Sequence, residues 1–187
     1  MTENKVQYGL NNMTIIPFTD SGTDIVYKKA IPYKGAVSIS LDPAGDVTSE
    51  YADNGLWFQL DNNQGFTGKM SMENLPLEVS TIILGDVADD NGVIAQSKVP
   101  GESVAIAFQF QGDKKATRHI LYNVGFKRAA EGSATKADKL EIKNFEFEFT
   151  AGLDPYLEVA KAKTNPDTAE TVYENWFTTP YRPTFSA

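Results

Sequence analysis

The chain has 187 residues, of which 41% are hydrophobic and 22% charged, so it is long and apolar enough to bury the core of one folded domain. It has no cysteine and one histidine, which excludes disulfides, thiolate chemistry and a histidine-based metal cluster. The formal net charge of -8 disfavours binding to nucleic acids, because affinity for DNA comes largely from Lys and Arg that displace counterions.

Alternation of apolar and polar residues is the dominant pattern, and it predicts antiparallel strands with one packed face and one wet face. The alternating segments, in chain order, are residues 37–41, 56–61, 69–73, 104–111 and 144–150. Turn sequences such as Asp53-Asn54-Gly55 separate them at intervals of about ten residues, which is typical of an all-β sandwich or barrel. Since no internal repeat or linker interrupts the pattern, we expect one mainly β domain over residues 1–187.

Two flanking helices are predicted. The first covers Pro76–Leu84, with Pro76 in its first turn and Gly85 as a natural stop. The second covers Thr168–Phe177, where Asp167 and Glu170 have the spacing of a capping box. One face of the second helix carries an apolar stripe. We expect the stripe to pack into the core, and contact with a neighbouring subunit is the alternative. The stripe consists of Ala169, Val172, Tyr173 and Trp176.

Two extended loops are expected. Residues Thr19 to Lys34 lack a clear period, and residues Ala129 to Asp138 are small, polar and contain glycine. Because neither segment shows a buried face, we predict that both are mobile in a free subunit and become ordered against neighbouring copies.

Charge is distributed unevenly along the chain. Acidic residues dominate Gly35–Asp113, where the basic residues are Lys69 and Lys98, whereas basic residues are in excess over Lys114–Phe145. This asymmetry is compatible with an ordinary solvated surface and also with head-to-tail stacking of unlike surfaces.

Motifs for catalysis or metal binding are weak. The segment Gly65–Lys69 has two residues between its glycines where a phosphate-binding loop needs four. The segment Asp86–Gly92 would place Val87 at the first ligand position of a calcium loop, so an acidic turn is favoured over weak cation binding. We therefore predict no catalytic, cofactor-binding or metal-binding residues, and a protein that is not an enzyme.

Two further features keep alternatives open. Glu146 and Glu148 lie on one strand face, roughly 6–7 Å apart by strand rise, a spacing that a glycosidase can use but that a solvated sheet face explains better. Trp57, Trp176 and the tyrosines are candidates for a sugar-binding platform. A β-sandwich module that binds carbohydrate or a receptor is therefore the alternative function.

A series of short motifs in fixed order resembles the major tail proteins, or tail tube proteins, of long-tailed bacteriophages of Gram-positive bacteria. The motifs are residues 36–45 (AVSISLDPAG), 51–54 (YADN), 64–68 (QGFTG), 83–85 (ILG), 91–92 (NG), 104–108 (VAIAF), 112–115 (GDKK) and 118–123 (RHILYN). Their order extends over about Lys5–Thr150, and Asn175-Trp176-Phe177 is also similar to that family. The segment Ala129–Asp138 departs from it.

This resemblance implies a structural virion protein without cofactor. Such subunits form a β-sandwich flanked by a helix, assemble as hexameric rings and stack into a tube through which double-stranded DNA passes without specific binding. The implied partners are other copies of the chain and the tape measure, tail terminator and distal tail proteins. The implied location is the virion tail, assembled in the host bacterial cytoplasm.

Candidate residues for the lumen of such a tube are the polar members of the alternating strands, because a conduit must contain DNA without binding its phosphates. The outer surface of a tube is also exposed to solvent, so it is an equal alternative location for these residues. The candidates are Glu146, Glu148, Gln109, Gln111, Ser71 and Glu73.

No signal peptide is visible in residues 1–6 and no run reaches the ~18–20 apolar residues of a membrane span, so we expect synthesis in a cytoplasm and no membrane partner.

Overall fold

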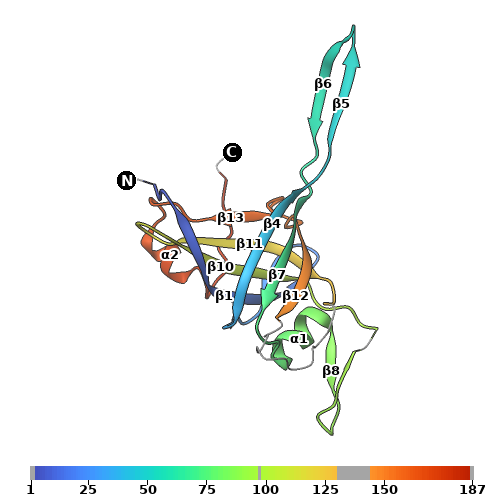
Figure 1. Cartoon of the computed structure of the whole chain (residues 1–187), viewed down its shortest axis with the longest axis vertical. Helices are drawn as coiled ribbons and strands as arrows, with labels where there is room; N and C mark the ends of the chain where they lie inside the picture. The colour runs from blue at the N-terminus through green and yellow to red at the C-terminus, as the bar shows by residue number, and fades with distance from the viewer. Residues whose placement is uncertain (1–2, 97, 130–143, 186–187) are drawn as a thin grey trace, which may run out of the picture.

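The computed structural model describes residues 3–96, 98–129 and 144–185, and over these residues the fold is mainly β, antiparallel and poor in helix, as predicted (Figure 1). Its helices are α1 (Leu77–Leu84) and α2 (Glu170–Asn175). Its strands are β1 (Gln7–Asp20), β2 (Ile25–Tyr27), β3 (Ile31–Pro32), β4 (Ala36–Ala44), β5 (Val47–Ala52), β6 (Gly55–Asp61), β7 (Gly65–Met72), β8 (Asp86–Ala88), β9 (Ile94–Gln96), β10 (Val104–Gly112), β11 (Thr117–Phe126), β12 (Phe145–Gly152) and β13 (Lys161–Lys163).

The main sheet curls around its core. Its hydrogen-bonded order in the described residues is β2-β1-β10-β11-β12-β7-β4, with β3 added to β1 and β13 added to β11. Strand β4 comes close to β1 again, but no ladder joins this pair in the part of the chain that the structure describes. The result is a partial barrel that remains open between β1 and β4.

The interior of the partial barrel is the principal core. On β12, Phe147, Phe149 and Ala151 are buried while Glu146 and Glu148 are exposed, which confirms the alternation predicted for this strand. Helix α1 packs against the same core through Val79 and Ile83. The buried members of this core are Met13, Ile15, Tyr33, Met70, Met72, Val79, Ile83, Leu84, Val104, Ile106, Phe108, Leu121, Val124, Phe147, Phe149 and Ala151.

The C-terminal segment covers the outer face of β10 and β11. Trp176 is 2% exposed, packs with Ala105, Ala107 and Tyr122, and donates a hydrogen bond from Nε1 to the His119 carbonyl oxygen at 3.1 Å. Strands β10 and β11 are therefore covered on both faces. The interpretation of the C-terminal apolar stripe as core packing is confirmed for Trp176.

Both predicted helices are present, but the second is shorter than predicted. Helix α1 follows Pro76 and ends at Gly85, whose positive φ of 71° and close approach to the Val99 carbonyl favour glycine. Helix α2 begins after Ala169 without a side-chain cap, so the predicted capping box is wrong. The side chains before it are engaged locally instead: Asn165 N–H donates to Thr168 Oγ1 at 2.9 Å.

Residues Thr19 to Lys34 also differ from the prediction, since they are not an unpatterned loop. Strands β2 and β3 lie within this segment and pair with β1, and the side chains of Ile25 and Tyr33 are buried. The strands are too short to show a period, which explains why the sequence pattern misses them.

No helix in the described residues is long and apolar enough to cross a membrane.

His119 is buried in an aromatic environment on β11. Its ring stacks on Phe108, with ring centroids 5.2 Å apart, and lies 5.0 Å from the ring of Phe110. Neither ring nitrogen has a hydrogen-bond partner in the described residues. Burial, together with the positive charges of Lys161 and Lys163, lowers the pKa of His119 from 6.5 to about 4.

We predict that His119 makes folding sensitive to mild acid. Because the unfolded chain binds a proton at the ordinary pKa while the folded chain binds it near pH 4, the free energy of unfolding should fall as pH decreases from about 6.5 to about 4, by up to about 1.4 kcal/mol for each pH unit. Urea unfolding across this range should show a weaker pH dependence for His119→Leu, which keeps every other titrating group. The same pH dependence in both proteins would contradict the prediction.

Candidate assembly surfaces

The hairpin β5–β6 projects from the body of the molecule (Figure 1). It continues the β4–β7 ladder: Gln64 N–H donates to the Ala44 carbonyl at 2.9 Å, and Asn62 N–H donates to the Asp46 carbonyl at 3.1 Å. At its tip Asp53 and Asn54 both have positive φ, 49° and 61°, as a two-residue hairpin turn requires. The ribbon from Ala36 to Met72 is therefore one long hairpin whose outer half has left the sheet.

The projecting hairpin carries large apolar side chains that are exposed to solvent. Trp57 is 75% exposed and Tyr51 is 72% exposed, and no residue of β5 or β6 belongs to either core of the described residues. The remaining exposed apolar side chains of this unit are Val47, Leu56, Phe58 and Leu60. The expectation that residues 56–61 form a strand is confirmed, but the expectation that its apolar face packs into the core of the same chain is wrong.

A second surface is the outer face of β4, β7 and β12. In the ladder Glu146 lies opposite Ser71, and Glu148 lies opposite Lys69, which in turn lies opposite Ser40. Glu148 also forms two exposed ion pairs, at 3.9 Å to Lys69 and 3.4 Å to Lys127. The face is therefore a mixture of hydroxyls and paired charges rather than a uniformly acidic surface.

The other predicted lumen residues do not all join this face. Gln109 is only 8% exposed and accepts a hydrogen bond from Arg118 Nε at 3.1 Å, so its prediction as a wet-face residue is wrong. Gln111 is exposed, but it lies on β10, away from β12 and β7 in the sheet order. Glu73 is exposed just beyond the end of β7, and Ser71 is half-buried.

The predicted loop residues have separate positions. Thr19 is paired with Val26 in the β1–β2 ladder, and Lys34 is exposed after β3. Ala129 is half-buried and packs against the main core. Asp138 lies outside the described residues.

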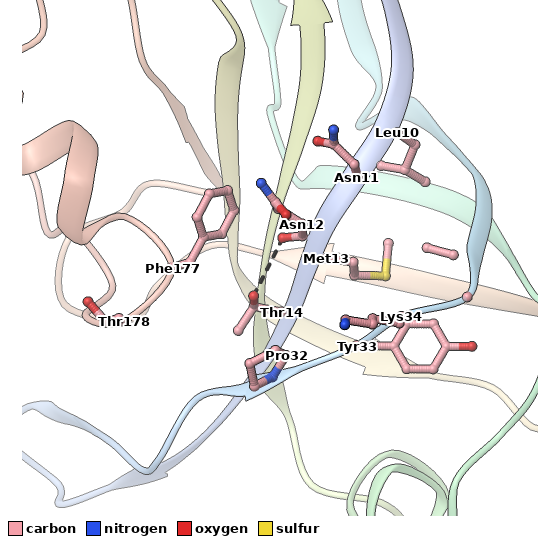
Figure 2. A pocket seen from close by; sticks show the side chains of 12 residues that line it. Leu10, Asn11, Asn12, Met13, Thr14, Pro32, Tyr33, Lys34, Phe177 and Thr178 are labelled. Carbon is pink, nitrogen blue, oxygen red and sulfur yellow. Dashed lines mark hydrogen bonds between the residues drawn. The ribbon is translucent and has the colours of Figure 1, made fainter.

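A groove crosses β1 where the β1–β10 ladder is irregular. The register shifts between Asn11 and Thr14, and Asn12 has a positive φ of 50°. In the close view Leu10 and Met13 lie on one side of β1, and Asn12 and Phe177 lie on the other (Figure 2). The groove has a volume of about 550 Å³ and is lined by Leu10, Asn11, Asn12, Met13, Thr14, Pro32, Tyr33, Lys34, Gly35, Ala36, Phe177 and Thr178. The sequence pattern does not predict this groove, because the groove depends on a bulge in β1.

The motifs weighed for chemistry have structural explanations. Residues Gly65–Lys69 lie within strand β7. The carboxylate of Asp89 accepts N–H bonds from Asn91 at 2.9 Å and Val93 at 2.8 Å, as in an ordinary acidic turn. No group of three or more His, Cys, Asp or Glu side chains in the described residues could hold a metal ion. Trp176 is buried, so it cannot belong to a sugar-binding platform on the surface.

Comparison with known proteins does not assign the chain to a family. A scan against protein-family models finds no match, and no curated protein sequence matches the chain. The class that the fold defines is therefore a mainly β, antiparallel structure with a projecting apolar hairpin, and the resemblance to tail tube proteins remains a hypothesis.

We predict that two phenylalanines with the same alternating pattern contribute very differently to stability. Phe147→Ala should lower the free energy of unfolding by about 3–5 kcal/mol, since Phe147 is 1% exposed in the main core. Phe58→Ala should change it by less than about 1 kcal/mol, because Phe58 packs against neither core. Denaturant unfolding of dilute protein measures both, and comparable losses would show that the hairpin packs on its own body.

Proposed function

We propose that the chain is a structural subunit of a bacteriophage tail tube, which assembles as hexameric rings that stack into a conduit for DNA ejection. The exposed apolar hairpin β5–β6 is the observation that carries the proposal, because it is a surface that this chain does not cover. The ordered motifs that resemble tail tube proteins supply the class of assembly. In this proposal the protein lies in the virion tail, after assembly in a bacterial cytoplasm, beside the tape measure, tail terminator and distal tail proteins.

The physical case for self-assembly begins with the stability of the hairpin. A two-stranded hairpin is only marginally stable in water when nothing packs on it. A long exposed strand with apolar side chains also invites aggregation, unless a specific partner covers it. A contact between a projecting hairpin and a different surface of another copy is heterologous, so it builds rings or open stacks rather than closed dimers.

The polar face of β4, β7 and β12 is the proposed wall of the conduit. A bore lined by unpaired Lys and Arg would bind phosphates and slow the passage of DNA. On this face Lys69 and Lys127 are instead paired with Glu148, and the neighbouring positions Ser40 and Ser71 are hydroxyls. Glu146 and Glu148 remain the proposed residues that face the DNA.

The proposal predicts assembly that depends on the hairpin. Purified protein at high concentration should form rings or tubes in negative-stain electron microscopy, and Trp57→Ala together with Phe58→Ala should abolish them while the monomer stays folded. Val6→Ala is the matched control, because Val6 is equally exposed, at 56% compared with 54% for Phe58, but lies outside the hairpin.

Sedimentation velocity would show whether the double variant remains a folded monomer. A wild-type protein that stays monomeric at every concentration, and is absent from purified virion tails, would reject the proposed function. Tubes formed equally well by the double variant would reject the role of the hairpin.

The proposed wall makes a second prediction. Reversing charge with Glu146→Lys and Glu148→Lys should leave tubes intact, because both side chains are exposed, but it should slow DNA ejection, most at low salt where phosphate attraction is least screened. Ejection kinetics of phage carrying the double variant provide the measurement. The same two substitutions leave the core residues Phe147 and Phe149 unchanged, so normal kinetics with intact tubes would place this face outside the lumen.

One observation favours the alternative function. Trp57 and Tyr51 present aromatic rings on an exposed hairpin, and such rings can stack on sugars. Binding of monomeric protein to a glycan array, lost in Trp57→Ala, would support a carbohydrate-binding module instead of a tube subunit.

A further inference from the structure

The proposed assembly raises the question of which surface receives the hairpin. The hairpin supplies two properties that its receptor must match. Its exposed side chains are large and apolar, with Trp57 and Phe58 near the middle of β6. Its charges are all negative, since residues 45–61 contain Asp46, Glu50, Asp53 and Asp61 and no Lys or Arg. A receptor should therefore be a concave apolar surface with positive charge at its rim.

The groove across β1 has these properties. Its floor and walls are largely apolar, through Leu10, Met13, Tyr33 and Phe177, and its volume of about 550 Å³ is in the range of pockets that accept bulky side chains. Lys34 is the charged residue that lines it, and no lining residue is acidic. Lys28 and Lys29 lie in the preceding connection, between β2 and β3, where Lys28 already pairs with Glu102 at 2.7 Å.

The groove also contains a polar group that needs a partner. Asn11 Oδ1 is buried and has no hydrogen-bond partner in the described residues. A buried acceptor without a donor costs free energy, so an occupant that brings an N–H or O–H is favoured over a purely apolar one. The indole Nε1–H of Trp57 and the hydroxyl of Tyr51 are donors of this kind on the hairpin.

The positions of groove and hairpin exclude contact within one chain. Ala36, the first residue of β4, lines the groove, whereas Ala44, the last residue of β4, leads into the hairpin. These residues are the two ends of the nine-residue strand, roughly 27 Å apart by strand rise, and the hairpin points away from the body (Figure 1). The two surfaces can meet only between copies, as a head-to-tail contact that repeats without closing.

We infer that the β5–β6 hairpin of one copy is received by the β1 groove of a second copy, with Trp57 toward Asn11 and the hairpin carboxylates toward Lys34. This inference rests on the proposed self-assembly and specifies its interface. Each copy uses both surfaces once, so the contact propagates along the stack.

A rival receptor lies at α1 and the β8–β9 hairpin. It exposes Leu77, Val87, Val93 and Ile94, so it is apolar enough to attract the hairpin. However, residues 77–96 contain Glu78, Asp86, Asp89 and Asp90 and no Lys or Arg, so this segment has the same sign of charge as the hairpin. Juxtaposition of like charges disfavours this receptor compared with the groove.

Cross-linking between introduced cysteines tests the inference, because the chain has no cysteine of its own. Ala52→Cys near the hairpin tip and Thr178→Cys at the groove, which leave the charges of both surfaces unchanged, are combined in one chain and treated with a short bis-maleimide under assembly conditions. Head-to-tail docking should give a ladder of dimers, trimers and higher multimers on a denaturing gel. Each single variant should stop at dimers, and Ala52→Cys with Val93→Cys, which probes the rival receptor, should give no ladder.

A charge swap between the two surfaces tests the same contact independently. Lys34→Glu should raise the protein concentration needed for assembly by about tenfold, and adding Glu50→Lys should restore much of the loss. Circular dichroism checks that each variant is folded.

The failures of the two proposals are distinguishable. If tubes form but no ladder appears with Thr178→Cys, whether or not one appears with Val93→Cys, the groove is not the receptor, while the proposed function stands. If neither tubes nor ladders form at any concentration, the proposed function fails and the groove assignment fails with it.

Discussion

The fold depends on the burial of β10 and β11 on both of their faces. Ile106, Phe108 and Leu121 fill the partial barrel on one side, while Ala105, Ala107 and Tyr122 lie under Trp176 on the other. The small residues Ala105 and Ala107 leave room for the indole, which is held by its bond to the His119 carbonyl. The apolar cluster around Trp176 includes no residue of β4, β7 or β12, and the outer face of these three strands is the one left open to solvent.

The same double covering explains the polar groups that it encloses. Gln109 continues the outer face of β10 and is buried against Arg118, whose guanidinium also lies over the ring of Tyr173 at 3.7 Å. His119 belongs to the inner face, where burial among aromatic rings lowers the pKa of its imidazole. Burying these polar side chains is an energetic cost of covering the sheet on both faces. They are concentrated at the end of β10 and β11 where the C-terminal segment crosses.

Much of the fold was predictable from the sequence, because alternation directly records which side of a strand is apolar. It identified the Phe147 and Phe149 core face, the exposed glutamates between them, and the short helix before Gly85. It failed where burial is decided elsewhere in the chain. The polar residue Gln109 is buried by a segment far along the sequence, and Val37 is exposed because the register shift between Ala36 and Ser38 puts Ala36 in the inward position. For the β5–β6 hairpin, the strand was predicted correctly but the burial of its apolar face was not. A strand that awaits another copy and a strand that packs on its own body have the same apolar period, so Phe58 and Phe147 cannot be distinguished by pattern.

The joint between the sheet and the hairpin has a mechanical consequence. Gly45 has a φ of 134°, and a Cβ there would lie 1.9 Å from the Asn62 carbonyl oxygen, so the backbone of the two strands can cross at this point only without a side chain. The hydrogen bonds on either side, from Asn62 and from Gln64, fix the direction in which the hairpin leaves. In a tube joined through hairpins, the direction fixed at this glycine would contribute to the rotation from each ring to the next, and hence to the helical pitch of the tube.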